Sequence, residues 1–396
     1  MPDDVGIGVA IALTAAGIVV APYIQPPWVL TILTLLLSGV LFTIKKTRYM
    51  AIAIAAIGVL YGLALLSLFV FAATLAIVVG GEFAFRQGEG PRSYLMYSIG
   101  AAVAGLGVMG YLGTGSPLVI SIGVLVAAML KSALGNRDDS LMVSGLGVAM
   151  TMFLFHEIGF RVDTRMLLAA VVIALAFGYF SYRLRAADLS GLFSGALVGI
   201  ILIVFADVRW FFIMLTFFIL GSACTRFRYE RKRQMGVAES HGGVRGYFNV
   251  FANGLVAVAA TVLFGLTQHE MFVALFLGSV TSAAADTVAS EIGVVGTTPY
   301  LITTFEPVAH GTNGGVTLIG EVAGTCAAGI VAIGAALLGV ADPAMALVCT
   351  GAGFVGTNVD SIVGATIENR GIIGNAGTNL IATLCGGLFA LFFFIA

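Results

Sequence analysis

The stretch DTVASEIG at residues 286–293 places Asp286 and Glu291 in a segment that is otherwise apolar. The 396-residue chain is 59% hydrophobic and only 10% charged, and a water-soluble globule with such a surface would not stay dissolved. Apolar stretches long enough to span a membrane recur from Val5 to the last residue. The sequence therefore predicts a polytopic integral membrane protein whose interior accepts carboxylates.

We expect an all-α fold with about twelve to fourteen transmembrane helices, because only helices or closed barrels satisfy the backbone in lipid. The stretch 50–79 is long enough to cross once or twice, so the number of spans stays open. Asp286 and Asp360 each precede a hydroxyl residue and follow a small-residue run, which suits the N-cap of a helix that begins inside the membrane. Some helices of the C-terminal half are therefore expected to be broken or re-entrant.

Charged residues are segregated along the chain. The net charge of −1 gives no indication of a nucleic-acid partner, but six of the 19 basic residues lie in the loop 225–246. The chain after Arg245 holds eight acidic residues and a single basic one, mixed with Gly, Asn and Thr in apolar sequence. We predict an N-terminal transmembrane domain of unknown role (1–187) and a second transmembrane domain (188–396) that carries the chemistry.

The basic loop 225–246 is expected to face the cytoplasm, because Lys- and Arg-rich loops beside spans usually do. The chain opens with acidic and apolar residues and not with a Ser- and Arg-rich transit peptide, which favours a prokaryotic cell membrane over a chloroplast. The sequence does not indicate the oligomeric state.

Acidic residues within predicted spans are the first candidates for chemistry. A lone carboxylate in hydrocarbon is costly, so such a group lines a polar cavity, becomes protonated, binds a cation or pairs with a base. Arg370 is the only Lys or Arg after Arg245. The charge of these acids must therefore be balanced by bound cations, by protonation or by pairing with the basic loop. Whether Asp286 and Asp360 share one site stays open. The acids in question are Asp286, Glu291, Glu321, Asp360 and Glu368.

Two further stretches can bind anions. In TTFEPVAHGTNGGVTLIGE (303–321), Pro307 and the glycines exclude a regular helix, and a glycine-rich turn can present N–H groups to phosphate oxygens or serve as an ordinary interhelical loop. In the basic loop, Arg245 precedes Asn249 and Asn253 at helical spacing, which predicts a polar stripe inside the membrane. The extra side-chain donors of the first stretch are Thr303, Thr304, Thr312 and Asn313.

Acids for a hard cation, donors for phosphate and basic side chains for phosphoryl charge together are the parts that phosphoryl transfer requires. The chain has no Walker A sequence, which excludes an ordinary P-loop pump. Broken helices and acids near the membrane centre are equally typical of a secondary transporter or a flippase for an ion or a phosphorylated lipid. Use of a nucleotide distinguishes an enzyme from such a carrier.

Several motifs, in the same order over about 188–396, resemble the integral membrane family numbered 92 among the domains of unknown function. Its best-understood relatives are the phytyl-phosphate kinases of tocopherol synthesis. The motifs are GSACTRFRYERKRQMG (221–236), RGYFNVFANG (245–254), DTVASEIG, ITT (302–304), GTNGGVTLIGE (311–321), DSIVGAT (360–366) and GNAGTNLIATL (374–384).

The resemblance implies a membrane-embedded kinase that transfers the terminal phosphate of CTP or ATP to a prenyl monophosphate, such as a phytyl- or geranylgeranyl-like one. Matched by position, Asp286, Glu291 and Asp360 would hold Mg²⁺, with Arg245 as the fourth catalytic residue. The residues expected to bind phosphate are Thr303, Thr304, Gly311, Thr312, Asn313, Gly314, Gly315, Arg226, Lys232, Asn249 and Asn253.

Overall fold

The computed structural model describes residues 2–44, 48–135 and 137–395. Within these residues, eleven helices are long and apolar enough to cross a membrane, and four shorter apolar helices accompany them. The all-α polytopic fold is therefore confirmed. The expected twelve to fourteen spans exceed the eleven long helices and are fewer than the eleven long and four shorter apolar helices taken together. The stretch 50–79 forms parts of two helices that are separated by a short turn.

The chain divides into two compact units, residues 1–171 with 192–197 and residues 172–191 with 198–396. The predicted boundary at 187/188 stays a prediction. The first unit contains α1 (Pro2–Val20), η1 (Ala21–Tyr23), α2 (Pro27–Thr43), α3 (Arg48–Gly62), α4 (Leu68–Phe85), α5 (Pro91–Leu112), α6 (Pro117–Leu134) and α7 (Ser140–Ile158). Helices α8 (Thr164–Arg183) and α9 (Leu189–Phe205) contribute residues to both units.

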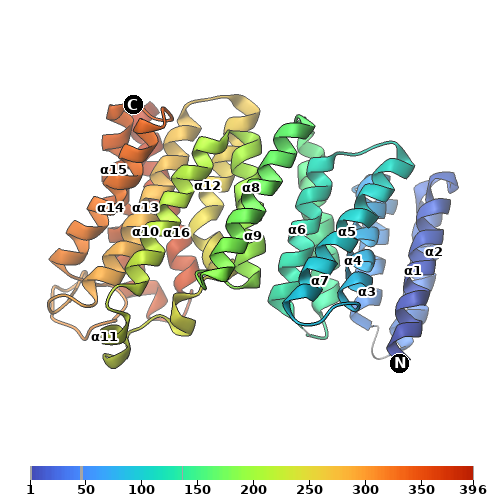
Figure 1. The fold of residues 1–396 in the computed structure, drawn as a ribbon, viewed down its shortest axis with the longest axis horizontal. Helices are drawn as coiled ribbons and strands as arrows, with labels where there is room; N and C mark the ends of the chain where they lie inside the picture. The colour runs from blue at the N-terminus through green and yellow to red at the C-terminus, as the bar shows by residue number, and fades with distance from the viewer. Residues whose placement is uncertain (1, 45–47, 136, 396) are drawn as a thin grey trace. The chain divides into compact units, whose positions relative to one another are not determined.

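The second unit is a bundle around α13 (Figure 1). Its elements are α10 (Val208–Arg226), α11 (Tyr229–Gln234), η3 (Ser240–Gly243), α12 (Tyr247–Thr267), α13 (Met271–Gly293), β1 (Tyr300–Leu301), β2 (Gly315–Val316), α14 (Leu318–Leu337), α15 (Pro343–Val363), the π-helical turn η4 (Gly364–Glu368) and α16 (Asn375–Ile395). Helix α13 packs against α10, α12, α14, α15 and α16.

Short polar side chains begin the helices of this unit. Asp188, Asp207, Thr317 and Asp342 each accept a backbone N–H of the first turn of α9, α10, α14 and α15 respectively. Such caps satisfy amide groups that have no partner at a helix start, and Pro343 follows Asp342 at a position where its missing N–H does no harm. Short loops with built-in caps thus join the spans.

The predicted helix starts at Asp286 and Asp360 are wrong. Asp286 lies inside the continuous helix α13, and Asp360 lies in the last turn of α15. The small residues before them do not break the helices; they admit the neighbours closely instead, as where Gly278 of α13 packs against α16. The irregular backbone expected in the C-terminal half is found between Val294 and Thr317, where β1 and β2 pair antiparallel, and in the π-helical turn η4.

Close packing on α13 yields a first prediction, for Gly324 of α14. A Cβ atom added there would lie 2.6 Å from the carbonyl oxygen of Ala285, whereas one added to Gly334 of the same helix would meet nothing within 4 Å. We expect Gly324→Ala to destabilise the bundle by about 1–3 kcal/mol through overpacking. Gly334→Ala, the matched control, should leave the thermal unfolding midpoint in detergent unchanged or slightly raised. Equal midpoints for both variants would contradict this packing.

Candidate functional site

A polar cavity of about 280 Å³ lies at one end of the second unit. It forms where α13 and α15 end and where α12, α14 and α16 begin, and residues of the connection between α13 and α14 line it as well. Ten of the predicted site residues line it: Arg245, Asn249, Asp286, Glu291, Gly311, Thr312, Asn313, Gly314, Gly315 and Asp360. The fold thus joins segments that are far apart in the sequence.

The two aspartates of the predicted site are neighbours across the α13–α15 contact. Their carboxyl groups are close enough to share a hydrogen bond when one is protonated. Glu321 and Glu368 are close enough to Asp286 to add their negative charge. Two adjacent carboxylates repel each other when both are ionised, so the pair requires either a proton or a cation. Asp286 and Asp360 therefore line one cavity.

The cavity lining is strongly acidic. Six carboxylates line it, and Arg245 is the one basic side chain among the described lining residues. Glu239, in the loop before α12, has a raised pKa because it loses hydration and because Glu291 adds negative charge. The excess of acids would repel a bare polyphosphate. The six acids are Glu239, Asp286, Glu291, Glu321, Asp360 and Glu368.

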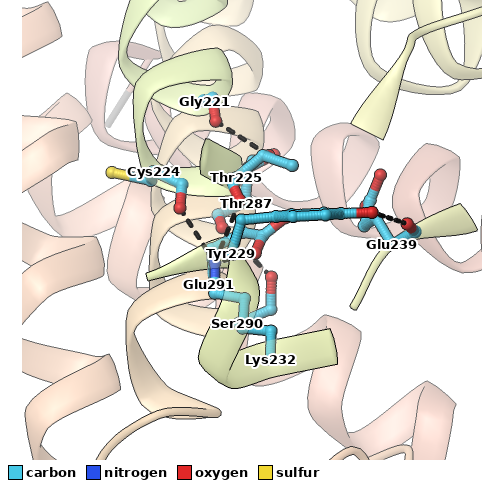
Figure 2. A network of polar contacts seen from close by, with 9 residues as sticks. All are labelled: Gly221, Cys224, Thr225, Tyr229, Lys232, Glu239, Thr287, Ser290 and Glu291. Atoms are coloured by element: carbon cyan, nitrogen blue, oxygen red, sulfur yellow. Dashed lines mark hydrogen bonds and ion pairs between the residues drawn. The ribbon is translucent and has the colours of Figure 1, made fainter. Parts of the chain in front are cut away.

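Glu291 lies on α13 but pairs with the basic loop instead of the aspartates (Figure 2). Lys232 of α11 is fully buried, and its Nζ donates to Glu291 Oε2 at 2.5 Å. The same Nζ donates to the carbonyl oxygens of Cys224 (2.9 Å) and Thr225 (3.3 Å) at the end of α10. Three acceptors use all three protons of the ammonium group, so Lys232 links α10, α11 and α13. Lys232 is not among the residues that line the cavity.

Arg245 lies in the loop before α12, is buried and lines the cavity. Its guanidinium donates to Asn249 Oδ1 at 2.9 Å and lies over the ring of Phe217 at 5.9 Å. Its backbone is held by Ala186 and Asp188 through two hydrogen bonds of 3.0 and 3.1 Å. Burial lowers the pKa of Arg245 from its usual very high value, an effect that Glu239 and Glu291 oppose. A held, buried guanidinium is suited to neutralising an anion in the cavity.

The other predicted donors divide into those near the cavity and those away from it. Asn253 is buried, donates to the Asn249 carbonyl at 3.0 Å and is not a lining residue. Arg226, the last residue of α10, is exposed and donates to the carbonyl of Leu184, which follows α8, at 2.6 Å. Thr303 and Thr304 lie in an exposed turn outside the cavity lining. The structure therefore does not bring these four residues to the cavity.

The glycine-rich turn 311–315 does line the cavity, against the end of α15. Gly311 and Gly314 have φ values of +81° and +80°, which residues with a side chain rarely adopt. A Cβ atom on Gly314 would lie 2.6 Å from the carbonyl oxygen of Ser361. Gly314 is required here on both counts, because the turn must lie directly on α15.

Five acidic or amide side chains of the cavity wall are absent from the predicted site: Glu239, Glu321, Glu368, Asn375 and Asn379. Glu321 and Glu368 had been noted as buried acids but not assigned to the site, and Asn375 and Asn379 belong to the start of α16. Asn379 is 7% exposed and its Oδ1 has no hydrogen-bond partner among the described residues. The polar run GNAGTN (374–379), directly before an apolar span, was the signal that could have identified Asn375 and Asn379.

The oxygen atoms of the cavity fit a hard divalent cation. Glu291 Oε1, Asp360 Oδ1 and Asn379 Oδ1 are buried and have no hydrogen-bond partner in the described part of the chain. No group of three or more His, Cys, Asp or Glu in that part is arranged to hold a metal ion by itself. Mg²⁺ is typically held by one or two carboxylates and completed by phosphate and water, which matches a pair better than a closed cage.

The amino-acid sequence matches the integral membrane protein family DUF92 over residues 172–387, which include the whole cavity. The chain belongs to this family. The predicted family resemblance is thereby confirmed, and all residues discussed above as candidates lie within the matched range.

Three relatives illustrate the range of the family. An uncharacterized membrane protein of Methanocaldococcus jannaschii is 33% identical over 225 residues, 56% of this chain and 92% of the relative. Protein PGR of Arabidopsis thaliana is 33% identical over 231 residues, 52% of this chain and 80% of the relative. The chloroplastic protein VTE6 of Arabidopsis thaliana is 32% identical over 166 residues, 40% of this chain and 50% of the relative. No solved structure matches the chain.

Proposed function

We propose that this membrane protein is an isoprenyl-phosphate kinase, which transfers the terminal phosphate of CTP or ATP to a prenyl monophosphate and so forms the diphosphate. The observation that carries the proposal is the Asp286–Asp360 pair, which shares one cavity with Arg245 and the glycine-rich turn 311–315. Similarity to VTE6, and the family's resemblance to phytyl-phosphate kinases, supports the reaction class.

Asp286 and Asp360 are the residues that would hold Mg²⁺, with Glu291 Oε1 and Asn379 Oδ1 as further oxygens in the cavity wall. A bound Mg²⁺ supplies positive charge to the donor phosphates and the leaving group. An acidic cavity without such an ion would repel a triphosphate, so nucleotide binding should require a divalent cation. This requirement separates the proposal from simple anion binding.

The transfer needs little help from a protein base. A phosphate oxygen of the lipid, anionic near neutral pH, attacks the terminal phosphorus, and the bond from that phosphorus to the bridging oxygen breaks. The nucleoside diphosphate leaves with the electron pair, and the total charge of the reactants equals that of the products. Arg245 faces the equatorial oxygens of the group in transfer, while backbone groups of the glycine-rich turn orient the donor phosphates.

The experiment incubates purified, detergent-solubilised protein with geranylgeranyl monophosphate, Mg²⁺ and γ-labelled CTP or ATP. Appearance of label in the prenyl diphosphate supports the proposal. Absence of transfer with either nucleotide, from protein with a cooperative thermal transition, rejects it and favours the secondary transporter or flippase. We further propose that the loop 225–246 lies on the cytoplasmic side of the membrane, where nucleotides are found.

A second prediction concerns Arg245. Replacing it by Gln removes the one basic side chain of the described cavity lining, so kcat should fall about 100-fold while nucleotide binding weakens less. Arg233→Gln is the matched control, because the Arg233 side chain is 72% exposed in the same basic loop and lies outside the cavity. Steady-state kinetics of label transfer measure both variants. Equal losses in the two would mean that the loop acts only through its overall charge.

A further inference from the structure

Asn358 occupies an unexpected place on α15. It lies one helical turn after Phe354 and one turn before Ile362, and those two side chains are 46% and 47% exposed. Leu347, further along the same face, is 75% exposed. In a membrane-spanning helix such a stripe of exposed apolar residues faces lipid, where a polar amide is costly unless it has a partner. Asn358 therefore interrupts a lipid-facing stripe.

The partner of Asn358 belongs to the cavity. The Asn358 amide donates to Glu321 Oε2 of α14 at 3.1 Å and to the Phe354 carbonyl oxygen at 2.8 Å. Glu321 lines the cavity, and its neighbours on α14, Leu318 and Val322, are 79% and 56% exposed. The Asn358–Glu321 hydrogen bond therefore joins a residue of the cavity wall to a residue of the lipid-facing stripe.

The two helices do not need this bond to stay together. Gly320 and Gly324 of α14 pack directly on α13, and Gly353 of α15 packs against both α13 and Ala328 of α14. These close contacts keep α14 and α15 packed together through α13, independently of the Asn358–Glu321 hydrogen bond. A single hydrogen bond contributes only about 1 kcal/mol, so it can be exchanged without loss of the bundle.

We propose that the seam between α14 and α15, closed by the Asn358–Glu321 hydrogen bond, is the lateral entrance for the lipid phosphate. This proposal rests on the proposed function and adds the path and the chain-binding surface of the acceptor. The phosphate enters the cavity as one of its oxygens replaces Glu321 as the acceptor of the Asn358 amide. The prenyl chain stays outside, along the seam surface formed by Leu318, Val322, Phe354 and Ile362. The polar nucleotide enters the cavity from the side formed by the loop before α12 and the connection between α13 and α14.

The first test is steric. Ile362→Trp and Val322→Trp obstruct the seam surface, so KM for geranylgeranyl monophosphate should rise about tenfold or more, while KM for the short acceptor isopentenyl monophosphate changes less than about twofold. Phe392→Trp is the control on an exposed residue of another helix, α16, and should change neither constant. Equal effects on both acceptors, or an equal effect of Phe392→Trp, would contradict the proposed entrance.

The second test does not depend on turnover. A monophosphate whose chain is one isoprene unit long and ends in a benzophenone is photo-crosslinked to the wild-type protein, and the labelled peptides are mapped by mass spectrometry. Label on residues 318–322 and 354–362, displaced by geranylgeranyl monophosphate and reduced by Asn358→Leu, supports the seam. Label elsewhere while phosphate transfer proceeds overturns the entrance and leaves the kinase standing. Label at the seam without transfer keeps the entrance and rejects the kinase.

Discussion

Asp286→Asn is expected to lower phosphoryl transfer about 1,000-fold, because the change removes one of two carboxylates that face each other in the cavity. The Asn side chain has nearly the same volume, so packing between α13 and α15 should persist. Fold is checked by the thermal transition and activity by label transfer. Nucleotide binding by the variant should need a higher Mg²⁺ concentration than binding by the wild type.

A matched control is available at the start of α15. Asp342 lies outside the cavity lining and accepts the Met345 N–H at 2.7 Å as a helix cap. Because Asn caps helices as well as Asp does, Asp342→Asn should retain full transfer. Full activity in Asp286→Asn would remove the acidic pair from the mechanism. Equal losses in both variants would point to a general sensitivity of the protein to lost negative charge.

Lys232→Met is expected to destabilise the protein by about 3–5 kcal/mol, because it leaves Glu291 as an uncompensated buried charge. The side chains of this pair are only 1% and 7% exposed, so little water replaces the Lys232 ammonium beside Glu291 Oε2. The carbonyl oxygens of Cys224 and Thr225 lose their donor as well. The thermal midpoint in detergent measures the loss, and Arg233→Met in the exposed part of α11 is the control.

The double variant Lys232→Met with Glu291→Gln identifies the cause. Removing both charges together eliminates the unpaired carboxylate, so the double variant should regain most of the lost stability. If the double variant is as unstable as Lys232→Met alone, the carbonyl contacts matter more than the ion pair. If Lys232→Met is as stable as the wild type, the buried pair described here does not exist in the native protein.

Much of the fold could be predicted, because lipid restricts the backbone to helices and apolar length then indicates the spans. The glycine-rich stretch was predicted to lack helix because Pro307 cannot donate a backbone hydrogen bond and glycines favour turns. Helix starts were predicted less well. Asp286 and Asp360 follow small residues that suit a cap, but the same residues suit close packing, and only the neighbouring helices decide between the two.

The sequence indicated which acidic residues lie in a cavity, but it did not indicate which side chains pair with one another. Two carboxylates in apolar sequence imply a cavity, whichever helices form it. In contrast, the hydrogen bond from Lys232 to Glu291 joins residues 59 positions apart. It depends on the packing of the short helix α11 against the end of α10. Arg226 was assigned to phosphate because it matches the family's basic loop by position, yet in the structure its guanidinium donates to the Leu184 carbonyl. Charge type predicts which chemistry is possible, and only packing assigns partners.

The most direct measurement of the central claim is phosphorus-31 NMR of one reaction mixture that contains wild-type protein, geranylgeranyl monophosphate, Mg²⁺ and CTP or ATP. The account predicts that prenyl diphosphate and nucleoside diphosphate appear in equal amounts, without inorganic phosphate, and that Asp286→Asn forms neither. Inorganic phosphate in place of the prenyl diphosphate, or an unchanged spectrum from folded protein with both nucleotides, would contradict it.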